Sequence, residues 1–108
     1  MDHWIDALDL PETWSDLRIP SDANASRKRS LTEELRRELG ADHPLATLQW
    51  QLIAACDARD DVLLDLGDGQ VAITHLTFTT SPPEPPPWPQ TEIAASETEL
   101  KTALELRD

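Results

Sequence analysis

Apolar residues follow two different periods along this chain, and each period predicts a different kind of element. Between Leu31 and Leu39 they recur every four positions, which is the spacing of one face of an α-helix. Ser30 and Glu33 form a capping box at the start of this stripe, in which a serine oxygen and a glutamate satisfy free backbone N–H groups. Gly40 follows and is suited to a left-handed C-terminal cap. The pattern predicts a helix from Ser30 to Leu39.

Residues 47–78 alternate between apolar and polar positions, as strands with one buried face do. Residues 47–56 form the first predicted strand, although the helical propensity of the same stretch supports a competing interpretation. Residues 62–66 and 71–78 form two more strands. Residues 67–70, Gly-Asp-Gly-Gln, are a hairpin signal because Asp-Gly supplies positive φ angles. Three consecutive antiparallel strands are expected.

The two ends of the chain complete the predicted domain. Residues 1–26 hold apolar clusters around Trp4 and Trp14, which indicate a segment docked on the core, with a short helix before Pro11 and a loop over residues 21–26.

Near the other end, residues 79–90 are a proline-rich connector that favours an extended conformation. A short strand at 91–94 and a helix introduced by the capping box of Ser96 and Glu99 follow. The sequence therefore predicts one α+β domain over residues 1–108. Its antiparallel sheet has three strands, or four with the short one, packed by an N-terminal and a C-terminal helix.

The formal net charge of −12 is the largest departure from an average composition. It argues against direct binding to nucleic acid or to anionic membranes, because phosphate binding needs clustered Lys and Arg. Five of the nine basic residues lie between Arg27 and Arg37, whereas Leu39 to Leu100 holds one basic residue, Arg59, against ten acids. The acidic half is either a solvated surface that keeps the chain soluble or a surface for a basic partner.

Cys56 is a single cysteine, so it forms no intramolecular disulfide and is expected as a small buried residue. Residues 1–10 lack the basic and apolar pattern of a signal peptide, and no apolar run is long enough to span a bilayer. We therefore expect a cytoplasmic protein without membrane association.

Metal and cofactor chemistry find little support in the sequence. His3, His43, Cys56 and His75 show no zinc-ligand spacing, and glycine-rich phosphate loops are absent. We expect no metal and no cofactor. His75, within an apolar strand, is the alternative ligand or catalytic residue; this role would need a nearby acid and a cleft. A structural histidine bonded to backbone or carboxylate is the competing interpretation.

Six residues are candidates for partner binding. Five are aspartates near the hairpin, for which turn chemistry is a simpler explanation than a calcium loop because the distal glutamate is missing. The sixth is an aromatic side chain in the proline-rich connector, which either anchors a partner or packs onto the sheet. The candidates are Asp57, Asp60, Asp61, Asp65, Asp68 and Trp88.

Several segments together resemble a family of small uncharacterised bacterial proteins with a DDVLF-x-L-x-DG…HLTW…WP-x-T pattern. The resemblance spans Leu31 to Ser96 and departs from the pattern at Phe78, where a tryptophan is usual, and in a longer proline run. It implies a compact bacterial domain and carries over no functional residues. The matching segments are Asp60-Asp61-Val62-Leu63-Leu64, Leu66, Asp68-Gly69, Ala72, His75-Leu76-Thr77-Phe78 and Pro87-Trp88-Pro89, with His43-Pro44-Leu45 after a helix.

These observations favour a small, non-catalytic binding protein, such as an immunity protein or inhibitor of a bacterial toxin, nuclease or defence enzyme. An acidic face that occupies a phosphate-binding cleft would suit such a role. Two alternatives stay open. One is an accessory subunit of a larger assembly, with an exposed apolar patch that includes Trp4, Trp14 or Trp88. The other is a small enzyme or ligand-binding domain centred on His75.

Overall fold

The computed structural model describes residues 4–5, 8–40, 43–56, 59–67, 69–76 and 91–107. It confirms the α+β class, but the sheet has five antiparallel strands, so the predicted three or four strands understated it. Within these residues the structure has five strands, two α-helices and one short 3₁₀ helix. In chain order they are β1 Ser15–Asp16, α1 Asp22–Glu38, the 3₁₀ helix Pro44–Ala46, β2 Gln51–Cys56, β3 Asp61–Gly67, β4 Gln70–His75, β5 Thr91–Ala94 and α2 Glu97–Arg107.

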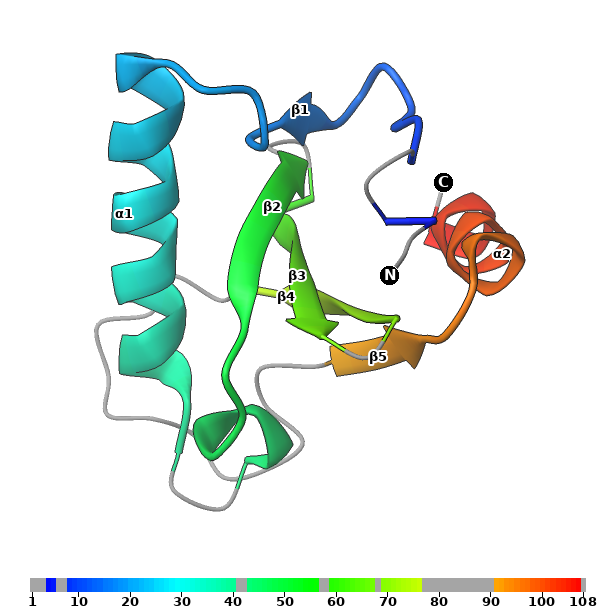
Figure 1. The fold of residues 1–108 in the computed structure, drawn as a ribbon. Helices are drawn as coiled ribbons and strands as arrows, with labels where there is room; N and C mark the ends of the chain where they lie inside the picture. Colours follow the sequence, from blue (N-terminus) through cyan, green and yellow to red (C-terminus); the bar gives the residue numbers. More distant parts are fainter. Residues whose placement is uncertain are drawn as a thin grey trace.

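The strands pair in sequence order, β1-β2-β3-β4-β5, and every neighbouring pair is antiparallel. Figure 1 shows α1 on one side of the sheet and α2 on the other, with the N-terminal segment crossing above the end of β2. The sheet is therefore buried on both faces. The prediction of strands with one buried face is therefore wrong: successive residues of β3 and β4, and most of those of β2, are buried alternately beneath α2 and α1.

Two predictions about the strands are confirmed in part. Residues 51–56 are a strand, so the helical interpretation of this stretch is wrong, but residues 47–50 of the predicted strand precede it and β4 ends at His75. The β3–β4 hairpin forms where Gly67 and Gly69 take φ angles of +80° and +76°, which only glycine adopts readily. Asp68, between these glycines, lies outside the described residues. A bulge between Leu52 and Ala54 shifts the register of β2 against β3.

Helix α1 begins earlier than predicted. Ser21 is its N-cap and accepts a hydrogen bond from the Asn24 backbone N–H at 3.0 Å, so residues 21–26 are not a loop. Ser30 lies inside the helix rather than at its start. The helix ends at Glu38, and Gly40 does not have the positive φ that a left-handed cap requires. The predicted apolar stripe is correct, because Leu35 is fully buried between the half-buried Leu31 and Leu39.

Helix α2 begins where the sequence predicts it. The Glu99 backbone N–H donates to Ser96 Oγ at 3.1 Å, and Glu99 Oε1 accepts from the Ala95 backbone N–H at 2.8 Å. The Glu99 side chain therefore accepts from the residue before the cap rather than from the cap itself, but both hydrogen bonds of a capping box have a counterpart here. Leu100 and Leu104 pack against the sheet.

The N-terminal segment is docked, as predicted, although its described residues before Pro11 contain no helix. The indole N–H of Trp4 donates to the Gly69 carbonyl at 3.0 Å and so joins the segment to the β3–β4 hairpin. Arg18 adds a second attachment: its guanidinium donates to the carbonyls of Ile5 at 2.6 Å and Leu8 at 2.7 Å.

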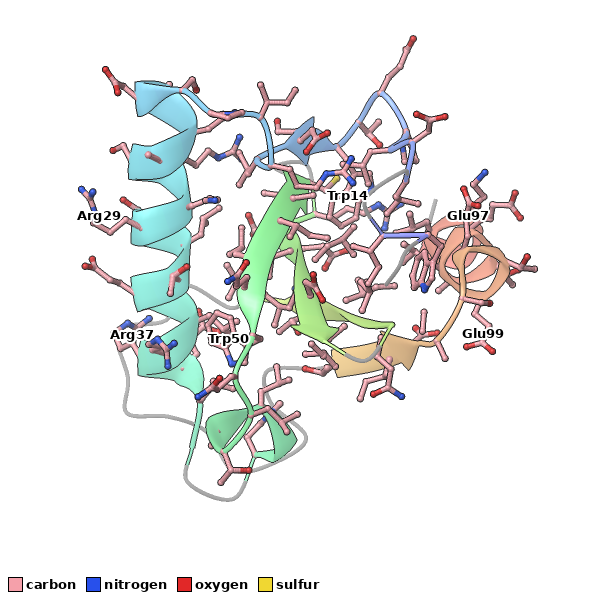
Figure 2. All side chains as sticks on the ribbon, viewed as in Figure 1. Trp14, Arg29, Arg37, Trp50, Glu97 and Glu99 are labelled. Atoms are coloured by element: carbon pink, nitrogen blue, oxygen red, sulfur yellow. The ribbon has the colours of Figure 1, made fainter. Side chains whose placement is uncertain are left out.

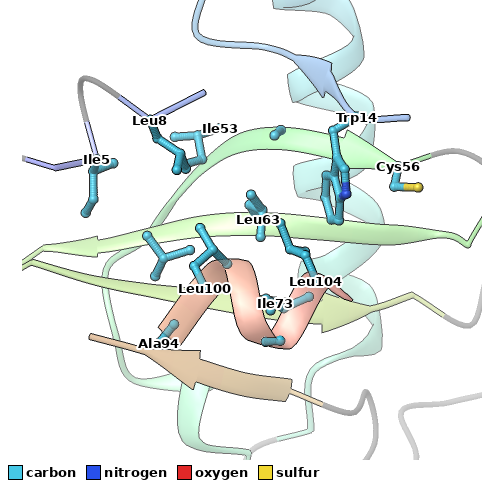
Figure 3. Packing of buried hydrophobic residues seen from close by; sticks show 13 residues of the cluster. Ile5, Leu8, Trp14, Ile53, Cys56, Leu63, Ile73, Ala94, Leu100 and Leu104 are labelled. Carbon is cyan, nitrogen blue, oxygen red and sulfur yellow. The ribbon is translucent and has the colours of Figure 1, made fainter. Parts of the chain in front are cut away.

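The core has two parts, one on each face of the sheet. Figure 3 shows the part beneath α2, in which the helix meets strand residues and the N-terminal segment. The other part lies beneath α1. The α2-side cluster includes Ile5, Leu8, Trp14, Ile53, Cys56, Leu63, Val71, Ile73, Leu100 and Leu104, and the α1-side cluster includes Leu17, Leu35, Leu45, Trp50, Leu52, Ala55, Val62, Leu64, Ala72 and Leu76.

Candidate functional site

The structure separates the aspartates that the sequence groups together. Asp60 and Asp61 lie where β3 begins, next to the β2–β3 turn, whereas Asp65 lies near the other end of the strand. Four residues of extended chain correspond to about 13 Å. The described aspartates therefore do not form one patch. The other three candidates, Asp57, Asp68 and Trp88, lie outside the described residues.

The three described aspartates also differ in environment. Asp60 is exposed and has a φ of 56° in the turn, which fits the predicted turn chemistry. Asp65 is half-buried, and its Oδ1 accepts a hydrogen bond from the Gly67 backbone N–H at 2.9 Å. Asp61 is 2% exposed and is bonded to a histidine. Only Asp60 has the exposure expected of a rim charge at an interface.

His75 has a carboxylate partner, as its alternative role requires. Its Nδ1 lies 2.9 Å from Asp61 Oδ1, and the two residues are register partners on β4 and β3. The imidazole is 43% exposed, whereas the carboxylate is buried. A buried acid that fixes one ring nitrogen is the orienting half of an acid–base pair. The same contact is equally consistent with a histidine that has only a structural role.

A reacting group for His75 is not supplied by Cys56. The register places Cys56 opposite Asp61 on β2 and His75 opposite Asp61 on β4, so Asp61 stands between them in one row across the sheet. Two strand spacings separate the cysteine from the histidine, or about 10 Å, which is beyond hydrogen-bond reach. Cys56 is 3% exposed within the apolar cluster beneath α2, as predicted for a small buried residue.

Two hollows on the described surface lie away from this pair. One is next to the start of α1, has a volume of about 540 Å³ and includes the 59% exposed Ile19. The other, of about 480 Å³, opens where β2 and β3 part, and Asp65 contributes to its wall. Neither hollow contains His75 or Asp61, so the cleft that a ligand site at His75 needs is not formed by either of them.

Charge is distributed unequally over the two helical layers. Helix α1 holds five basic and four acidic residues and so has a formal charge of +1, which leaves −13 on the rest of the chain. Figure 2 shows Arg29 and Arg37 on α1, and Glu97 and Glu99 on α2 across the sheet. Exposed acids of the α2 layer lie on α2 and on the N-terminal segment, namely Asp9, Glu12, Glu99 and Glu105, and Glu92 of β5 is exposed opposite the α2-side residue Ile73.

Sequence reasoning missed this acidic surface because its members come from opposite ends of the chain. Asp9 and Glu12 lie 87 to 96 positions before Glu99 and Glu105, and no local motif connects them. The available signal was the docking of the N-terminal segment, which the two tryptophans predicted. The structure brings Ile5, from this segment, and Leu100, from α2, into one apolar cluster.

Two acidic groups have pKa values shifted by their surroundings. The Arg18 guanidinium, which bonds to Asp16 at 2.8 Å, holds the pKa of that carboxyl below its usual value. Burial and a hydrogen bond with Glu38 raise the pKa of Glu34, which also pairs with Arg37. Both groups have structural partners within the domain, and neither lies beside His75.

Within the described residues, neither helix is long and apolar enough to cross a membrane. In the same ranges, His, Cys, Asp and Glu side chains do not gather in groups of three or more that could hold a metal ion. No family model, curated protein or solved structure matches the chain, so its resemblance to the small bacterial family stays a prediction from the quoted residues.

Proposed function

We propose that this chain is a small acidic, non-catalytic protein that binds a protein partner with a basic surface. An immunity protein or inhibitor that blocks a bacterial toxin, nuclease or defence enzyme is the form of this function that we favour. The observation that carries the proposal is the concentration of the net charge of −12 outside α1. A field of one sign steers an oppositely charged partner and suppresses wrong partners.

The α2 side is the face that fits this partner best. Asp9 and Glu12, from the N-terminal segment, and Glu105, from α2, are exposed there without any ion pair described for them. Glu97 is partly neutralised by Lys101 at 3.2 Å. The segments that carry these acids share one packed core, so their charges are held in place rather than spread along a mobile tail.

A nuclease illustrates how such a face would act. The cleft of a nuclease must attract phosphates, so it is lined with basic side chains. Carboxylates at fixed positions would occupy the same cleft and exclude the substrate. No chemical step is required of the chain, which agrees with the separation of Cys56 from His75.

The accessory-subunit alternative finds less support. It predicted an exposed apolar patch that includes Trp4, Trp14 or Trp88, but Trp14 is 9% exposed and Trp4 packs against the core. Trp88 lies outside the described residues. Among the described residues, the large apolar side chains that are exposed lie on different segments: Ile19, Leu48 and Ile93.

The test is affinity capture from the native host with the tagged chain and two charge-matched double variants. Glu12→Lys with Glu105→Lys changes the α2 side, and Asp22→Lys with Glu33→Lys changes α1; both raise the net charge by four units. We expect one basic protein in a one-to-one complex with the wild type. The α2-side variant should bind it about tenfold more weakly or worse, equivalent to about 1.4 kcal/mol.

The α1-side variant is the control for net charge. It should bind the partner within about twofold of the wild type, because its changed residues face away from the proposed interface. Recovery of no stoichiometric protein partner, or equal losses in both variants, would refute the proposal.

A further inference from the structure

Strand β5 is the edge strand at one end of the sheet, and its middle residues are exposed. It pairs with β4 over Thr91–Ala94 and, among the residues that the structure describes, with no other strand. Figure 1 shows β5 at the end of the sheet opposite β1. Glu92 is exposed, and Ile93 is 48% exposed. The middle of β5 is therefore accessible to another molecule.

The backbone of Ile93 is directed toward the outer edge of β5. The Leu76 N–H donates to the Asp60 carbonyl at 2.8 Å, and in an antiparallel pair such bonded positions alternate with unbonded ones. Even-numbered residues of β4 therefore direct their backbone groups toward β3, and odd-numbered ones toward β5. Ile73 is the register partner of Glu92, so Glu92 faces β4 through its backbone and Ile93 directs its N–H and C=O away from β4. An exposed strand edge of this kind is a template for another strand.

The side chains of β5 give its two faces different characters. Glu92 lies opposite Ile73 on the α2 side of the sheet, and Ile93 lies opposite Ala72 on the α1 side. Figure 3 shows Ala94, two residues after Glu92, within the cluster beneath α2. A strand added to β5 would alternate its side chains between these faces. A basic side chain suits the position beside Glu92, and an apolar one suits the position beside Ile93.

The segment that continues from β5 into α2 is acidic. Residues 91–100 include three acids and neither Lys nor Arg. Glu99 is exposed, and the Glu97 side chain is 43% exposed although Lys101 bonds to it at 3.2 Å. Glu92 lies on the same side of the sheet as α2, so the edge adjoins the acidic α2 side. Its field favours a basic strand over an acidic one.

We propose that an extended segment of the basic partner protein adds to the sheet along the outer edge of β5, with a Lys or Arg side chain beside Glu92 and an apolar side chain beside Ile93. The proposal rests on the function proposed above and names the surface and mode of binding. Charge argues for this occupant over a second copy, because two chains of −12 each repel and an acid on an edge strand opposes pairing with its own kind. Backbone pairing supplies affinity, and the alternating side chains supply specificity.

The test uses an array of short synthetic peptides that alternate Lys or Arg with Val, Thr or Ile, and the tightest binder is titrated into the full chain. We expect the Ile93 amide to shift in the NMR spectrum and to become protected from hydrogen exchange. The same peptide N-methylated at every second residue along its pairing edge should bind at least about tenfold more weakly, because the pairing donors are lost. Methylation along the opposite edge should leave the affinity within about twofold.

Two substitutions on β5 separate backbone pairing from charge. Ile93→Pro removes an N–H that is directed away from β4, and proline is tolerated at such a position of an edge strand. It should bind the peptide at least about tenfold more weakly than Ile93→Ala, which keeps the N–H. Glu92→Gln should weaken the peptide several-fold, whereas the matched variant Glu33→Gln, on the exposed face of α1, should not.

The proposal is overturned if no array peptide binds, if the Ile93 amide is unaffected by the bound peptide, or if the two N-methylated peptides bind alike. Protection of the Ile93 amide that depends on protein concentration alone would assign the edge to a second copy instead. A captured natural partner that binds without protecting the Ile93 amide would end this inference while leaving the proposed function intact.

Discussion

The two layers that cover the sheet are built in different ways. The α1 layer centres on one continuous helix of 17 residues, with Leu35 fully buried beneath it. The α2 layer combines a helix of 11 residues with the N-terminal segment, which joins the same apolar cluster through Ile5, Leu8 and Trp14. A sheet with two apolar faces needs two covers. Here the shorter helix is sufficient only because the opposite end of the chain completes its layer.

The same contrast extends to charge. The α1 layer is nearly neutral, whereas the α2 layer presents acids from both of its segments. An acidic face built from distant segments depends on the packing that holds those segments together. The predictions below separate the contributions of the two layers, beginning with the change that should cost most stability.

Leu35→Ala and Leu100→Ala remove equivalent buried side chains from the two layers, since both leucines are fully buried. Each should lower the free energy of unfolding by about 2–5 kcal/mol, through lost burial and the cavity left behind. Urea unfolding measures both losses of stability. Ile93 is 48% exposed, so Ile93→Ala is a control that should change stability little. If Leu100→Ala produced two separate transitions, the layers would not share one cooperative core.

Arg18→Ala should loosen the α2 layer alone. The guanidinium bonds to the Ile5 and Leu8 carbonyls and to the Asp16 carboxylate, so its removal leaves polar groups without these donors. The free energy of unfolding is expected to fall by about 2–3 kcal/mol, and by less in Arg18→Lys. Hydrogen exchange should increase at residues 8–10 and stay unchanged in the middle of α1. A uniform increase over both layers would contradict this assignment.

His75→Ala removes one partner of the buried Asp61 carboxylate. The free energy of unfolding should fall by about 1–2 kcal/mol, because the Asp61 carboxylate loses one hydrogen bond. His75→Gln should be less destabilising than His75→Ala, since an amide N–H can donate to the same oxygen. A loss of the one-to-one partner complex in both variants, at unchanged stability, would instead give His75 a role in binding.

Acid should weaken the N-terminal attachment specifically. Because the Arg18 guanidinium lowers the pKa of Asp16, ionised Asp16 stabilises the folded chain above the ordinary carboxyl pKa of about 4. This contribution is lost as pH falls below that value. Asp16→Asn should therefore be less stable than the wild type at pH 7 and approach it in acid. Parallel stability curves from pH 7 to pH 3 would contradict the contribution of this ion pair.

Local sequence signals predicted the elements whose boundaries are set by neighbouring residues. Ser96 and Glu99 are close enough to form their capping interaction, so the start of α2 could be predicted. The start of α1 could not, because Ser21 caps through Asn24 without a glutamate, and the Ser30 and Glu33 pair matches a capping box inside a continuous helix. A two-residue strand such as β1 is defined by its partner rather than by its own residues.

The candidate site was harder to predict than the fold because it depends on register. Asp61 and His75 are 14 residues apart, and only the pairing of β3 with β4 makes them neighbours. Conversely, Asp61 and Asp65 are close in sequence, but an extended strand separates them by about 13 Å. The acidic α2 side required both the docking of the N-terminal segment and the position of α2.

The most direct test of the central claim is the association rate of the captured basic partner with the wild-type chain and the two double variants, measured at about 50 and 500 mM salt. The account predicts that the rate falls steeply with salt, because electrostatic steering is screened. It also predicts a markedly slower rate for Glu12→Lys with Glu105→Lys than for Asp22→Lys with Glu33→Lys at low salt. Rates that are independent of salt, or equal in the two variants, would contradict an acidic binding face on the α2 side.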